Sequence, residues 1–145
     1  MSPQFSVACD LSARPVPRGE WGPKVFSEIL TRLAAETDDV QGVLLMDFEG
    51  IPIESVQGPV WPHAFDITTV GMEISVALKG LARAFSILEG SPCDTVELQG
   101  HAFTLSLRML TEEYFLMAVM SPTALRGRAN YRLRMAAPAL RAALS

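Results

Sequence analysis

The feature of the sequence that most constrains the fold is a long amphipathic segment from about Asp66 to Glu89. Its apolar residues recur every three or four positions, which predicts a helix. Asp66 or Thr68 is expected to cap the start of this helix. Gly90 suits a helix C-terminus and Pro92 blocks continuation, so the helix is expected to end there.

Two different sides of this expected helix carry apolar residues. The first side is expected to pack on the chain's own sheet and consists of Val70, Ile74, Ala77, Leu81, Phe85 and Leu88. The second side, called the seam below, consists of Thr69, Met72, Glu73, Val76, Gly80, Arg83 and Ile87. Because a surface helix needs only one apolar side, the seam predicts a contact with another helix, most simply that of an identical chain across a two-fold axis. Alternatively, the first helix, the last helix or the N-terminal arm covers the seam within one monomer.

The remaining pattern predicts a single α+β domain over residues 22–145, preceded by a flexible proline-rich arm over residues 1–21. The expected order is helix, two strands, helix, three strands, helix. It builds a five-stranded antiparallel sheet with the long helix on one face and two helices on the other. The expected segments are a helix from near Pro23, strands within 42–48, 51–56, 94–99, 102–110 and 114–120, and a helix over about 123–144. Pro52 cannot donate a ladder hydrogen bond, so the strand 51–56 is expected at a sheet edge.

Composition excludes several classes of protein. The 145 residues are 49% hydrophobic and 19% charged, and the mean hydropathy of +0.24 indicates apolar surface that a partner covers. No stretch approaches the roughly 20 apolar residues of a membrane span. Cys9 and Cys93 are the only cysteines, so neither a disulfide framework nor a zinc site is expected. The expected location is a reducing cytoplasm.

Basic residues are concentrated near the end of the chain. Residues 1–100 carry 6 basic and 14 acidic side chains, whereas residues 101–145 carry 6 basic and 2 acidic ones. Five arginines lie between Arg126 and Arg141, and Tyr131 is the only aromatic residue among them. We interpret this cluster as the solvated face of the last helix, so no nucleic-acid partner is expected.

The stretch VLLMDFEGIPIES, from Val43 to Ser55, places two carboxylates beside a glycine. On a strand, Asp47 and Glu49 would point the same way, as acid–base chemistry requires. No third group lies near them in the sequence, and turns favour Asp and Gly for backbone reasons, so a turn is predicted.

The sequence lacks the common motifs of nucleotide-binding, catalytic and metal sites. It contains neither a phosphate-binding glycine loop nor a nucleophile elbow. Its two histidines, His63 and His101, lack neighbours at metal-ligand spacing. No catalytic residue, cofactor or metal site is therefore predicted.

The whole set of elements resembles the roadblock / dynein light chain family, in particular its bacterial stand-alone branch of gliding-motility GTPase regulators. The residues that carry the resemblance are the GVLLMDFEGIPIES hairpin, the long helix with two apolar sides and the strand pair HAFTLSLRML…YFLMAVMS. The resemblance implies a dimer in which the middle helices pack together and the third strands pair edge to edge. Here these are the helix Thr69 to Ile87 and the strand Asp94 to Gln99, with Thr95, Val96, Glu97 and Leu98 in the interface.

The resemblance also implies a function. Family members are generally adaptors and not enzymes, so we expect a non-enzymatic homodimeric regulator in bacterial polarity or motility control. Its expected partner is a small Ras-like GTPase or another roadblock protein, and Lys79 and Arg83 are the candidate partner-binding residues. Two alternatives stay open: a scaffold without GTPase regulation, and a small-molecule-sensing module like profilin or PAS domains, which would need an internal apolar cavity.

Overall fold

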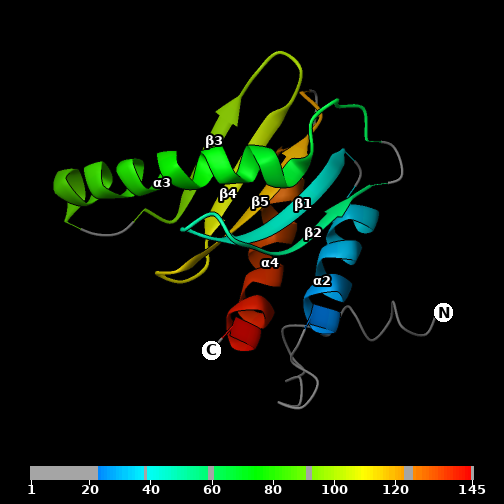
Figure 1. The fold of residues 1–145 in the computed structure, drawn as a ribbon, viewed down its shortest axis with the longest axis horizontal. Coiled ribbons are helices and arrows are strands. Elements are labelled where there is room, and N and C mark those ends of the chain that lie inside the picture. The colour runs from blue at the N-terminus through cyan, green and yellow to red at the C-terminus, as the bar shows by residue number, and fades with distance from the viewer. Residues whose placement is uncertain (1–22, 38, 59–60, 91–92, 123–125, 145) are drawn as a thin grey trace.

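The fold is α+β, in the element order that the sequence predicts (Figure 1). The computed structural model describes residues 23–37, 39–58, 61–90, 93–122 and 126–144. The expected arm over residues 1–21 and the expected start of the last helix near Thr123 lie outside these ranges. The elements are α2 (Pro23–Glu36), β1 (Val40–Asp47), β2 (Pro52–Gln57), α3 (Ile67–Glu89), β3 (Thr95–Gln99), β4 (Thr104–Met109), β5 (Tyr114–Met120) and α4 (Arg126–Leu144).

The five strands form one antiparallel sheet in the order β2-β1-β5-β4-β3. The two apolar strands β1 and β5 lie inside the sheet, where both faces are covered. Strand β2 begins at Pro52 and forms one edge, as predicted, and a register shift between Leu45 and Met46 lies beside it. Strand β3 forms the other edge.

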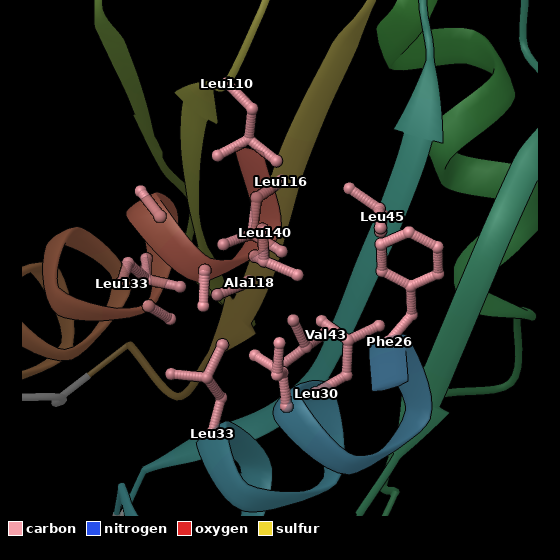
Figure 2. Packing of buried hydrophobic residues seen from close by; sticks show 14 of the residues in the cluster. Phe26, Leu30, Leu33, Val43, Leu45, Leu110, Leu116, Ala118, Leu133 and Leu140 are labelled. Carbon is pink, nitrogen blue, oxygen red and sulfur yellow. The ribbon is translucent and has the colours of Figure 1, made fainter. Parts of the chain in front are cut away.

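The two faces of the sheet carry separate apolar clusters. Alternation along β1 sends Val43 and Leu45 to one face and Leu44 and Met46 to the other, and all four are fully buried. Helices α2 and α4 cover the first face, and α3 covers the second (Figure 1). Figure 2 shows how leucines of α2 and α4 meet those of the sheet in the first cluster.

The helix faces in the first cluster are those that the sequence predicts. In α2, Phe26, Ile29, Leu30 and Leu33 are all buried. In α4, the buried residues of the predicted stripe are Ala129, Leu133, Ala136, Ala137 and Leu140, while Leu144 is half-buried. Both helices therefore use their single apolar side on the chain's own sheet.

The acidic stretch between β1 and β2 is a hydrogen-bonded turn. The Oδ1 atom of Asp47 accepts hydrogen bonds from the backbone N–H groups of Glu49 and Ile51, both at 2.9 Å. Gly50 has a φ of 89°, which suits glycine and few other residues. The predicted turn is confirmed, and Asp47 has a structural role in it.

Candidate functional site

Helix α3 is longer than the sheet surface beneath it, and its second half extends past the β3 edge (Figure 1). In the first half, Ile67, Gly71, Ser75 and Leu78 are buried against the sheet. A Cβ atom on Gly71 would overlap the side chain of Leu44, so this glycine allows the close approach of α3 to β1.

The prediction that one continuous stripe of α3 packs on the sheet is wrong for part of that stripe. Val70, Ile74 and Phe85 are half-buried, but Ala77 is exposed. Leu81 is 46% exposed and Leu88 is 81% exposed. Both residues belong to the second half of α3, which extends past the β3 edge (Figure 1), so the sheet does not cover them.

The seam faces away from the sheet and is exposed along its length. Val76 is 71% exposed and Ile87 is 81% exposed. A Cβ atom on Gly80 would meet nothing within 4 Å, so the helix surface is open there as well. The other exposed residues of the seam are Thr69, Met72, Glu73 and Arg83. Helices α2 and α4 lie on the opposite sheet face, so they do not cover the seam (Figure 1).

The four interface residues expected in β3 lie at the open end of the sheet. Strand β3 pairs with β4 on one side, and no described strand pairs with its other side. Val96 packs into the cluster beneath α3, and Leu98, two residues further on, faces the same side and is exposed. Thr95 and Glu97 face the opposite side and are exposed.

The two candidate partner-binding residues have different surroundings. The Nζ atom of Lys79 lies 3.1 Å from Oε2 of Glu49 in the β1–β2 turn. Arg83 lies one helical turn further on, within the exposed seam. Lys79 therefore points towards its own turn, whereas Arg83 shares its surface with Val76 and Ile87.

Sequence reasoning placed Leu81 and Leu88 in the core, but the structure adds them to this exposed surface. Their helical spacing is the same as that of the buried residues, so periodicity could not separate the two groups. The length of α3 relative to a five-stranded sheet was the signal that could have done so. The open surface thus has three parts: the seam, the end of α3 around Leu81 and Leu88, and the β3 edge.

The described residues include no group of three or more His, Cys, Asp or Glu that could hold a metal ion. None of the helices in the described ranges has both the length and the apolar character needed to cross a membrane. His63 instead belongs to an aromatic cluster. Its ring stacks on Phe65 at 4.9 Å and meets Trp61 and Phe103 edge-on, and its Nε2 atom lies 2.7 Å from Oε1 of Gln41.

No family model matches the sequence, and no curated protein matches it. Solved structures match the fold over most of its length. A structure of MglB with a tetrameric arrangement shares 20% identity over 90% of this chain and 96% of its own, with a TM-score of 0.77. The gliding protein MglB of Thermus thermophilus shares 21% identity over 83% of this chain and 88% of its own, with a TM-score of 0.74.

A Roadblock/LC7 domain from Streptomyces avermitilis is similar as well. It shares 15% identity over 81% of this chain and 95% of its own, with a TM-score of 0.67. At identities of 15–21%, these similarities establish the fold alone. The chain therefore has the roadblock fold that its sequence predicts.

Proposed function

We propose that the protein is a non-enzymatic homodimeric regulator of the cytoplasm that binds a small Ras-like GTPase or another roadblock protein, in the control of bacterial polarity or motility. The observation that carries the proposal is the overhang of α3. Its exposed apolar residues lie beyond the sheet and on the side of the β3 edge, to which no further described strand is paired.

A two-fold partner satisfies both of these features at once. If the β3 strands of two chains pair, the two sheets join, and each overhanging helix end has the partner's sheet beneath it. Leu81 and Leu88 then find the apolar surface that their own sheet does not supply. Burying a side chain such as Leu or Ile contributes about 1.5–3 kcal/mol, so the two copies of the overhang supply a substantial driving force.

The same arrangement gives the seam a partner. Across a two-fold axis, the α3 helices lie side by side, with Val76 and Ile87 of one chain against the seam of the other. Gly80, which has open space around it, allows the two backbones to approach closely.

The similar structures support a role in motility. Two of them are MglB proteins, one named a gliding protein and one described in a tetrameric arrangement. A regulator that has no active site of its own would act on a GTPase by positioning the switch loops of the GTPase or by presenting an arginine to it. Arg83 is our first candidate contact, because it is exposed on the seam. Lys79 is the second, once it leaves Glu49.

The dimer is tested by light scattering with size-exclusion chromatography over a range of protein concentrations. The wild type is expected to elute as a dimer, and Val76→Glu and Ile87→Glu are expected to elute as folded monomers. Met135→Glu is the matched control, because Met135 is an exposed apolar residue on α4, which covers the opposite sheet face. A wild type that stays monomeric at all concentrations would remove the basis of the proposal.

The partner is tested with purified small Ras-like GTPases from the same genome. Each GTPase, loaded with GDP or with a non-hydrolysable GTP analogue, is titrated with the regulator in a calorimeter. Binding that prefers the GTP form and weakens in Arg83→Gln supports the proposal, whereas the absence of binding to every GTPase and every roadblock protein contradicts it. The rate of GTP hydrolysis with and without the regulator then separates an activator from a scaffold.

A further inference from the structure

The seam of α3 is arranged symmetrically about the level of Leu78. Leu78 is buried against the sheet, and exposed seam residues are placed in pairs at equal distances before and after it in the sequence. The pairs are Val76 with Gly80, Glu73 with Arg83, and Thr69 with Ile87. The seam therefore has a centre, and two copies of it can be matched about that centre.

An antiparallel pair of identical helices with its two-fold axis at Leu78 brings the members of each pair to the same level. Val76 and Gly80 are about one helical turn apart, and Thr69 and Ile87 are about five turns apart. The two residues of each of these pairs thus point in nearly the same direction, so each faces its counterpart in the second chain. Val76 of one chain then fills the space over Gly80 of the other, where an added Cβ atom would meet nothing within 4 Å.

Glu73 and Arg83 lie on the two flanks of the line that joins Thr69 to Ile87. In the same antiparallel arrangement, Glu73 of each chain is level with Arg83 of the other, so a dimer contains this pair of charges twice. A helix crossing angle of about +20°, the usual value for helices that pack as in coiled coils, tilts these flanks towards each other. Both side chains are long and exposed, so they can meet across the helix contact.

The chain's own described residues do not neutralise these two charges. Within the ranges that the structure describes, neither Glu73 nor Arg83 forms an ion pair. The residues three and four positions from Glu73, where a partner on the same helix would lie, are uncharged. At such a distance from Arg83 the one charged residue is Lys79, which has the same sign and contacts Glu49. A second chain supplies the opposite charge in both cases.

We propose that ion pairs between Glu73 of one chain and Arg83 of a second copy select an antiparallel homodimer centred at Leu78. This inference rests on the homodimer of the proposed function and adds its polarity, its register and the residues that select the partner. A parallel pair would set Glu73 against Glu73 and Arg83 against Arg83, and like charges repel. A different protein pairs equally well only if it carries suitable opposite charges at both levels.

Sedimentation equilibrium of the full-length protein measures the dimer dissociation constant of each variant. Glu73→Arg and Arg83→Glu are each expected to raise this constant about tenfold or more, because each dimer exchanges two attractive charge pairs for two repulsive ones. An equimolar mixture of the two single variants is expected to recover a constant close to that of the wild type. In the mixed dimer one chain is basic at both positions and the other is acidic at both, so both pairs attract.

The double variant Glu73→Arg/Arg83→Glu tests the contact itself, because its net charge equals that of the wild type. Both signs are reversed, so the charges attract again across the two-fold axis and the variant should dimerise like the wild type. Additive weakening by the two substitutions would mean that the side chains do not contact each other, and would overturn the proposal. Glu73→Gln tests the polarity: it should weaken an antiparallel dimer, and a tighter dimer would also overturn the proposal.

The matched control is Glu28→Arg. Glu28 is exposed on α2, which covers the opposite sheet face, so this variant has the same change of charge as Glu73→Arg and is expected to dimerise like the wild type. Circular dichroism confirms that each variant is folded. Equal weakening by Glu28→Arg would contradict a specific ion pair. A monomeric wild type would overturn this inference together with the proposed homodimer, whereas a wild-type dimer without coupling between the two positions would overturn this inference alone.

Discussion

The ammonium group of Lys79 contacts the carboxylate of Glu49 at 3.1 Å, which ties the middle of α3 to the β1–β2 turn. Both side chains are exposed, and exposed ion pairs of this kind contribute about 0.2–1 kcal/mol. We therefore expect Glu49→Gln and Lys79→Met to lower the free energy of unfolding by less than about 1 kcal/mol each. A double-mutant cycle in urea, repeated at high salt, measures the coupling, which salt should reduce. A coupling that salt leaves unchanged would contradict a simple exposed ion pair.

Asp47 is expected to stabilise the turn through its side-chain oxygen. Asp47→Ala removes the acceptor of two backbone N–H groups, which we expect to cost about 1–2 kcal/mol of unfolding free energy. Asp47→Asn keeps one oxygen acceptor and should retain most of the stability. Chemical denaturation of both variants checks the prediction, and equal losses for Ala and Asn would show that the charge matters more than the acceptor.

Gly71→Ala is expected to destabilise the fold by about 1–3 kcal/mol, the usual cost of overpacking a core. The new methyl group would overlap Leu44 and lie 3.1 Å from the Cε atom of Met46, and both residues are fully buried. Thermal and urea unfolding measure the effect. A variant as stable as the wild type would mean that α3 moves away from β1 without cost.

Gly80→Ala is the matched substitution on the opposite side of the same helix. Its methyl group meets nothing within 4 Å, so it should stabilise the isolated monomer by about 1 kcal/mol through helix propensity. In the proposed dimer the same methyl group separates two closely packed helices and raises the dissociation constant. Unfolding at low concentration and sedimentation equilibrium at higher concentration measure the two effects. A dissociation constant equal to that of the wild type would place the helix contact away from Gly80.

Hydrophobic periodicity along the chain determines how much of this fold the sequence predicts. Alternation identified the faces of β4, where Leu105 and Leu107 are buried under α3, and spacing of three and four identified the buried side of α2. These signals depend only on neighbours along the chain, so they predict secondary structure and the direction of side chains. The position of Pro52 at an edge was predictable as well, because it depends on one missing donor.

The predictions that failed depended on distances across the fold. Leu88 has the spacing of a core residue, yet it is 81% exposed, because the width of the sheet decides where α3 loses its support. The hydrogen bond between Ser106 and Asn130 was equally hidden, since these two residues meet only when α4 aligns with β4. Neither the width of a sheet nor the alignment of a helix on it is encoded in local spacing.

The unequal edges of the sheet limit how many subunits can join through it. At β2, Pro52 lacks a donor and the neighbouring ladder is shifted in register, which discourages another strand from adding there. Among the described residues, strand β3 contains no proline and no register shift, so one more strand can add there. Strand pairing thus has a single growth point per chain, and in the proposed dimer two chains that meet at β3 would use up that point in both, so they would not extend into a fibre.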